Sequence, residues 1–222
     1  MKIFSENDVS LEEGEMKTAI LTVGMRGAGK THFCKAVHKV RPDIHFFCRD
    51  DYFNEHFGHF TFDPYSGEGP YAAQCFWQFL IESINQNEGI FLIDYWTGYV
   101  ETRVDLINRL YIAGAEKVIA WFFNTPLKKN IEWFIEREFD PNKKWESKEN
   151  LADRCESDYN LFRKNIDDIL DFNKIDPAEI VPNSDLHPRW DKYKFHFDQV
   201  ITINQTQENS LKNILQILPI LV

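Results

Sequence analysis

Residues 24–31 combine three glycines, a lysine and a threonine at a spacing suited to phosphate binding. The segment reads Gly24-Met25-Arg26-Gly27-Ala28-Gly29-Lys30-Thr31, the pattern G-x-x-x-x-G-K-T. Glycines let successive backbone N–H groups point into one concavity, and a helix that begins here adds partial positive charge. The lysine of such a loop reaches the β- and γ-phosphates of a nucleotide, and the hydroxyl is a ligand for Mg²⁺. We therefore predict that all eight residues bind ATP and that Thr31 also holds the metal.

A second candidate metal ligand ends an apolar run further along the chain. Residues 90–93 are Ile-Phe-Leu-Ile, and Asp94 follows them. A carboxylate at the end of a buried strand, beside a phosphate loop, binds Mg²⁺ directly or through water. We predict this role for Asp94, although an aspartate in that place can also simply cap a strand.

A pair of acids follows another apolar run. Asp50 and Asp51 come shortly after residues 44–48, which are strand-like. Ligands of open α/β sheets bind at the carboxyl ends of the strands, so Asp50 is expected near the phosphate loop. A carboxylate there accepts the proton of an attacking hydroxyl. We predict that Asp50 is a catalytic base, and the alternative is a solvated pair of acids that ends the strand.

Strand-like and helix-like stretches alternate along the chain, and they must position these residues. The expected strands are 19–23, 44–48, 90–93, 117–123 and 200–203, and the expected helices are 29–40, 71–87, 101–113, 126–139, 151–172 and 207–218. This alternation predicts the α/β class, with a five-stranded parallel sheet and helices on both faces. We expect a single domain over residues 1–222, with a helical lid at about 137–154 and an irregular excursion at about 173–197.

Composition and missing motifs exclude several classes of protein. The chain has 25 basic and 35 acidic residues, a net charge of −10, which argues against non-specific binding to nucleic acid or to an anionic membrane. No D-x-x-G or N-K-x-D motif of a GTPase is present, and no apolar window approaches the length of a membrane span. The four cysteines are scattered, which favours reduced thiols in a cytoplasmic protein.

The phosphate loop and residues 49–52, Arg-Asp-Asp-Tyr, together resemble the phage-type 5′-polynucleotide kinase. They also resemble the wider P-loop kinase group that includes zeta toxins and chloramphenicol phosphotransferase. Asp94 and the Thr-Pro-Leu segment at 125–127 match the same pattern. The resemblance implies that Asp50 activates the acceptor hydroxyl. It also implies that Arg137, on the helix after the fourth strand, belongs to a lid and contacts the transferred phosphate.

The acceptor half of this pattern differs from the polynucleotide kinase. That kinase carries an arginine shortly after D-D-Y, which helps to hold the nucleic acid, and this chain has Phe53 there. Residues 136–140, Glu-Arg-Glu-Phe-Asp, are also acidic for a nucleic-acid clamp. These departures favour a small-molecule or nucleotide acceptor over extended nucleic acid.

Basic residues bracket the break between two expected helices. Arginines that close over the γ-phosphate stabilise transition-state charge and exclude water. We predict that Arg137 is catalytic and that Arg154 binds ATP, with Lys143 and Lys144 as weaker candidates. The alternative is a solvated charged loop.

Aromatic residues gather on the expected acceptor side. Residues 57–70 are rich in aromatics and glycines, and they either stack on a base or sugar ring or form a small satellite core. Tyr95, Trp96 and Arg103 follow Asp94 and are further candidates to line the pocket. For Arg103 the choice lies between a contact to an acceptor anion and a position on a helix surface.

Together these residues favour an ATP- and Mg²⁺-dependent phosphotransferase whose acceptor is a hydroxyl of a small molecule or nucleotide. Asp50 is the base, Lys30 and Arg137 stabilise phosphoryl charge, and Thr31 and Asp94 organise the metal. The alternatives are a nucleotide-binding regulator or slow ATPase without an acceptor, a 5′-polynucleotide kinase, and a toxin-like kinase that acts on a nucleotide sugar.

Overall fold

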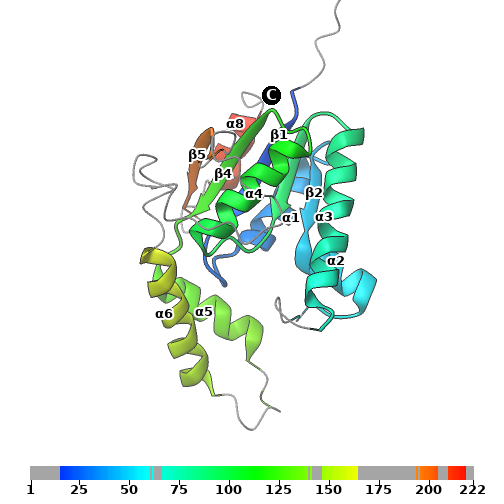
Figure 1. The fold of residues 1–222 in the computed structure, drawn as a ribbon. Coiled ribbons are helices and arrows are strands. Elements are labelled where there is room, and N and C mark those ends of the chain that lie inside the picture. The colour runs from blue at the N-terminus through cyan, green and yellow to red at the C-terminus, as the bar shows by residue number, and fades with distance from the viewer. Residues whose placement is uncertain are drawn as a thin grey trace, which may run out of the picture.

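The computed structural model describes residues 16–60, 62, 67–139, 141, 147–164, 194, 196–204 and 210–218. Five parallel strands form one sheet in the order β2-β3-β1-β4-β5 (Figure 1). They are β1 (Thr18–Val23), β2 (His45–Cys48), β3 (Ile90–Asp94), β4 (Lys117–Phe123) and β5 (Gln199–Ile203). This arrangement confirms the predicted sheet, since each strand lies within two residues of its expected range.

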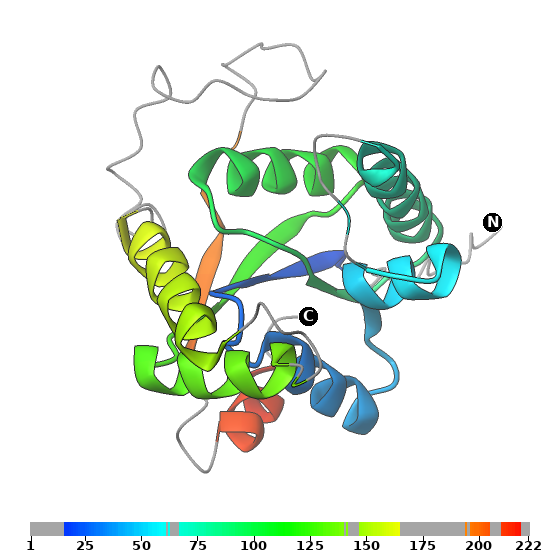
Figure 2. The same ribbon diagram turned by 90° about the horizontal axis from the view of Figure 1, so that it is seen from below.

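Helices cover both faces of the sheet, as predicted. They are α1 (Lys30–Val40), α2 (Arg49–Phe57), α3 (Gly69–Gln86), α4 (Val100–Ile112), α5 (Leu127–Glu138), α6 (Lys148–Lys164) and α8 (Ser210–Ile217). Figure 2 shows α1 and α8 on one face and α3 and α4 on the other. Helices α5 and α6 lie beyond the carboxyl edge of the sheet, with α2 at the other end of the same edge (Figures 1 and 2).

The central strands are buried on both faces, which explains their continuous apolar runs. All the residues of β1 and β3 are buried, and so are all but the first of β4. Parallel strands with helices on both sides have no solvent-facing side, so their sequences do not alternate. The carboxyl ends of β1, β2 and β3 are adjacent, and Cys48 pairs in register with Asp94. The sheet therefore brings the phosphate loop, Asp50 and Asp94 to one edge.

Helix α2 differs from the sequence-based expectation, which placed Asp50 at the end of a strand. The strand ends at Cys48, and a helix begins at Arg49 with Asp50 and Asp51 in its first turn. Carboxylates in a first turn are stabilised by the helix dipole, which accounts for the early start. Helix α6 likewise begins at Lys148, three residues before the expected position.

Some predicted features lie outside the described residues. These are Lys143 and Lys144, residues 165–172 of the expected sixth helix, and all of the 173–197 excursion except residues 194, 196 and 197.

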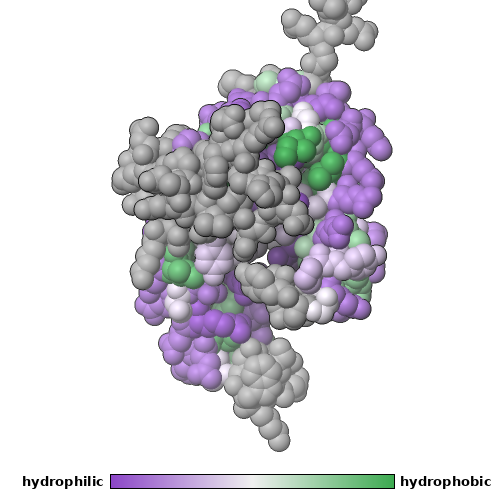
Figure 3. All heavy atoms as spheres, in the orientation of Figure 1, coloured by the Kyte–Doolittle hydropathy of each residue, from purple (hydrophilic) through white to green (hydrophobic). Residues whose placement is uncertain are grey.

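On the face shown in Figure 3, hydrophilic colours dominate among the coloured residues, and green appears only in small separate patches. Among the described residues, none of the helices has both the length and the apolar character that crossing a membrane requires.

Candidate nucleotide-binding and catalytic site

The loop between β1 and α1 has the backbone of an anion-binding nest. Gly27 and Gly29 have φ angles of 73° and 77°, in the left-handed region that favours glycine, and α1 begins directly afterwards at Lys30. The loop packs tightly against α5, because a Cβ atom at position 27 would lie 2.8 Å from the carbonyl oxygen of Asn130 and 3.0 Å from Cβ of Phe134. Helix α5 therefore packs directly against the phosphate loop.

Replacing Gly27 with alanine should destabilise the protein and weaken ATP binding, because the new Cβ meets the backbone of α5. The matched control is Gly58→Ala, since Gly58 has φ 78° and open space around its Cβ position. Both variants bear the left-handed backbone penalty of about 1–2 kcal/mol. Only Gly27→Ala adds crowding, so its melting temperature should fall about 5 °C further. Equal melting temperatures would show that α5 can move away from the new Cβ atom at no cost in stability.

The Lys30 ammonium is held inside the loop. Its Nζ donates to the carbonyl oxygens of Gly24 and Met25, both at 2.9 Å. An ammonium has three N–H donors, so one remains for a phosphate oxygen. Burial lowers the pKa of Lys30, and nearby Arg137 lowers it further, while Asp94 and Asp50 raise it. Asp50 and Arg137 thus both lie within electrostatic range of Lys30.

Asp94 is buried and fixed by two hydroxyl groups. Thr22 donates to one carboxylate oxygen at 3.0 Å, and Thr31 donates to the other at 2.5 Å. The Cys48 thiol lies 3.9 Å from the second oxygen. Thr22 was missed by sequence reasoning, because a threonine inside an apolar run fits a strand without any special role.

The pair of Thr31 and Asp94 fits a Mg²⁺ site of the kind that the sequence predicts. A hydroxyl and a carboxylate at one point supply hard oxygen donors. Within the described ranges, no group of three His, Cys, Asp or Glu side chains is arranged to hold a metal. A Mg²⁺ ion here would therefore take its remaining ligands from water and nucleotide phosphates, as Mg²⁺ usually does.

Two buried thiols surround this carboxylate but carry no charge at neutral pH. Burial raises the pKa of Cys48 to about 12, and it also raises the pKa of Cys34. Asp94 adds to both shifts, because a thiolate beside a carboxylate is unfavourable. Neither thiol therefore acts as a nucleophile here.

Asp50 projects from the first turn of α2 with its side chain half exposed. One of its oxygens accepts hydrogen bonds from Nε and Nη2 of Arg49, at 2.9 and 2.6 Å. The Arg49 guanidinium in turn lies over the rings of Phe53 and Tyr95, at 5.5 and 5.4 Å. Arg49 therefore orients Asp50, and the second carboxylate oxygen accepts no hydrogen bond from a described residue. Its neighbour Asp51 instead pairs with Lys35 on the surface, at 2.7 Å.

The two arginines that the sequence predicts for a lid, Arg137 and Arg154, both contact the ring of one phenylalanine. The guanidinium carbons of Arg137 and Arg154 lie 5.7 and 5.2 Å from the ring of Phe134. Phe134 is buried between α5 and α6, where it packs with Leu151. Its Cβ also faces Gly27 of the phosphate loop. The arginines are thus anchored close to the loop, and Arg137 is paired with Glu138 at 2.7 Å.

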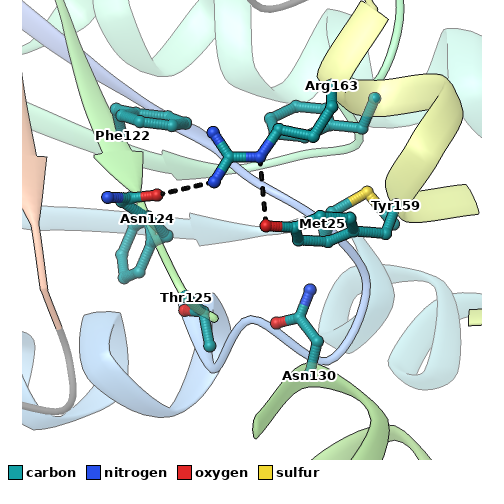
Figure 4. A pocket seen from close by; sticks show the side chains of 9 residues that line it. Met25, Phe122, Asn124, Thr125, Asn130, Tyr159 and Arg163 are labelled. Carbon is teal, nitrogen blue, oxygen red and sulfur yellow. Dashed lines mark hydrogen bonds between the residues drawn. The ribbon is translucent and has the colours of Figure 1, made fainter. Parts of the chain in front are cut away.

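A further arginine, which sequence reasoning missed, connects α6 to the residue after β4. Arg163 of α6 donates to the Asn124 side chain at 3.1 Å and to the Tyr159 hydroxyl at 3.0 Å (Figure 4). Beside it lies a cavity of about 10 Å³, also lined by Met25 of the phosphate loop and by Asn130. Such a volume is that of a single water molecule and is too small for a nucleotide base. Arg163 therefore links α6 to the residue that follows β4 through a hydrogen bond.

Two aromatic side chains of the 57–70 segment, Phe57 and Phe62, pack against the main hydrophobic core. Phe53, Phe57 and Phe62 pack edge to face with one another, at centroid distances of 5.2 to 6.1 Å. Phe53 also contacts Phe76 of α3. Phe57 and Phe62 therefore lie at the edge of the main core rather than in the separate satellite core that the sequence suggested.

Both expectations for Arg103 are wrong. Its side chain is 1% exposed, and Nη1 donates to the backbone oxygen of Thr97 at 2.8 Å. The Thr97 hydroxyl donates to the backbone oxygen of Thr22 at 3.0 Å. Arg103 therefore holds the segment of residues 95–99 in place, because its guanidinium supplies the donor that the buried backbone carbonyl of Thr97 requires.

Comparisons with known proteins identify the fold. No protein-family model matches the sequence, and no curated protein matches it. The chain is similar to shikimate kinase from Bacteroides thetaiotaomicron, with a TM-score of 0.51 and 13% identity over 92% of this chain and 97% of that one. It is also similar to a chain of the Pnkp1/Rnl/Hen1 RNA repair complex, with a TM-score of 0.53 and 15% identity over 69% of this chain and 47% of that one.

These similarities show the fold, a five-stranded parallel α/β sheet with helices on both faces that is similar to the fold of shikimate kinase. Identities this low carry no information on the substrate. The narrower resemblance to the phage-type polynucleotide kinase, zeta toxins and chloramphenicol phosphotransferase therefore stays a prediction.

Proposed function

We propose that this protein is an ATP- and Mg²⁺-dependent phosphotransferase that moves the γ-phosphate to a hydroxyl of a small molecule or nucleotide. The observation that carries the proposal is the arrangement of side chains around the phosphate loop. Lys30 Nζ donates to the carbonyl oxygens of Gly24 and Met25, and the Thr31 hydroxyl donates to the Asp94 carboxylate. Asp50, in the first turn of α2, lies at the same edge of the sheet. A nucleotide-binding regulator needs no carboxylate in the position of Asp50.

In this proposal the chain's own residues divide the work of an in-line displacement. The backbone N–H groups of residues 24–31 and the Lys30 ammonium bind the β- and γ-phosphates. Asp50 accepts the proton as the acceptor oxygen bonds to γ-phosphorus and the bond to the β,γ-bridging oxygen breaks, which releases ADP. Arg137 and Arg154 stabilise negative charge on the transferred group and exclude water. Bound Mg²⁺, held by Thr31 and Asp94, would neutralise phosphate charge.

The surface charge supports a small acceptor. The net charge of −10 opposes the approach of an extended polyanion, and Arg137 is already paired with Glu138. We therefore rank a 5′-polynucleotide acceptor below a metabolite or a mononucleotide.

Incubation with γ-labelled ATP, Mg²⁺ and a pool of cellular metabolites tests the proposal. We expect label in at least one organic product, separated from free phosphate by chromatography. The Lys30→Met variant supplies the background, since it lacks the phosphate-binding ammonium. Label that reaches free phosphate alone would indicate a slow ATPase and would refute the proposed transfer to an acceptor.

A further inference from the structure

Arg26, in the middle of the phosphate loop, has an unusual environment for a charged residue. Its side chain is exposed, and its guanidinium carbon lies 5.3 Å from the centre of the Trp96 ring. It forms no hydrogen bond or ion pair with any residue that the structure describes. In contrast, Lys30, Arg49 and Arg137 each donate to oxygen atoms at the same site.

The Trp96 ring is a fixed platform for this guanidinium. A Cβ atom at Gly98 would lie only 2.1 Å from Cζ2 of Trp96, so the indole lies directly against the backbone of residue 98. Tyr99 contacts the same indole edge to face, at a centroid distance of 6.5 Å. Arg103 holds the same segment, residues 95–99, by donating to the Thr97 carbonyl oxygen. These contacts hold the indole in place, and among the described residues no oxygen accepts a hydrogen bond from the N–H groups of Arg26.

The position of Trp96 places Arg26 on the acceptor side of the site. Strand β3 lies between β1 and β2, so residues 95–99 extend between the phosphate loop and the start of α2 with Asp50. The adjacent Tyr95 supports Arg49, which orients Asp50. The contact with Trp96 therefore places the Arg26 guanidinium beside residues 95–99, on the Asp50 side of the phosphate loop.

We propose that Arg26 is an acceptor-binding residue and that the acceptor carries a carboxylate or phosphate group in addition to its reactive hydroxyl. This inference rests on the proposed phosphotransferase function. A guanidinium recognises either oxyanion through two parallel hydrogen bonds. A cation–π contact at an exposed site is weak, so an anion readily takes over the N–H groups while the ring stays in place. In a chain with a net charge of −10, an anionic acceptor needs such a dedicated cation.

Fractionation of the acceptor pool before the reaction separates this inference from the proposed function. Metabolites are divided by anion exchange into a retained and an unretained fraction, and each is incubated with the protein, Mg²⁺ and γ-labelled ATP. We expect organic label from the retained fraction. Label from the unretained fraction alone would overturn the inference and leave the phosphotransferase standing. Organic label from neither fraction would overturn both.

Treating the retained fraction with phosphatase beforehand distinguishes a carboxylate acceptor from a phosphate acceptor, because only a carboxylate acceptor keeps its anionic group.

Substitutions at Arg26 then test the residue itself. Arg26→Gln should raise the apparent KM for the retained fraction by about 10- to 100-fold, the loss expected for a charge-assisted hydrogen bond, with a much smaller change in the KM for ATP. Arg26→Lys should recover part of the loss. The matched control is Arg41→Gln, since Arg41 pairs with Asp43 before β2, at the opposite edge of the sheet. A larger effect on the KM for ATP than for the acceptor would assign Arg26 to the nucleotide and overturn the inference.

Discussion

Replacing Lys30 with methionine is expected to abolish ATP turnover while the fold stays intact. The Lys30 ammonium donates to the loop carbonyls of Gly24 and Met25, whereas the other cation of residues 24–31, Arg26, is exposed. Loss of a preorganised charge at a transferred phosphoryl group lowers kcat by about 10²–10³-fold or more. Turnover is measured as ADP release in a coupled assay with saturating Mg²⁺.

Stability of the Lys30→Met variant should change little, because two effects oppose each other. Burial lowers the pKa of Lys30, so the charged lysine costs stability at neutral pH and methionine removes that cost. Two loop carbonyls lose a donor, which costs about 1–3 kcal/mol. Lys39→Met, at an exposed position on the same helix, is the control and should keep full turnover. A Lys30→Met protein with more than a tenth of normal turnover would exclude this nucleotide-binding mode.

The features that sequence reasoning found are those with strong local signals. The loop 24–31 combines a full motif with an apolar strand before it and a helix after it, and Asp94 ends a run that is buried on both faces. Each of these elements is recognisable without knowledge of the rest of the chain. The parallel sheet followed from the same runs, because only strands covered on both sides are apolar throughout.

The features that it missed depend on contacts between distant segments. Arg103 has the sequence context of a surface residue of α4, but it is buried and donates to the carbonyl of Thr97, a residue outside its helix. Thr22 is significant only because β3 places Asp94 opposite its hydroxyl. Arg26 stands at a position of the motif where any residue is allowed, and its role depends on Trp96, seventy residues away. No pattern within one segment carries this information.

Replacing Asp50 with asparagine is expected to preserve ATP binding and to remove phosphoryl transfer. The amide keeps the size of the carboxyl group, and its oxygen still accepts from Nε and Nη2 of Arg49. It cannot take a proton from the acceptor hydroxyl, so the rate of transfer should fall by about 10²–10⁴-fold. The loss should be in kcat, because the phosphate loop is unaffected. Binding of a non-hydrolysable ATP analogue is measured beside label transfer.

Asp51→Asn provides a closely matched control for this experiment. Asp51 is the next residue in the same helical turn, and the substitution removes the same charge beside the same helix dipole. Its carboxylate pairs with Lys35 on the surface, an interaction worth at most about 1 kcal/mol. We therefore expect Asp51→Asn to transfer phosphate within a few-fold of the normal rate. If instead Asp51→Asn loses transfer and Asp50→Asn keeps it, the base is Asp51, and Arg49 does not orient the catalytic group. Equal losses in both variants would point to the summed charge of the turn rather than to proton transfer.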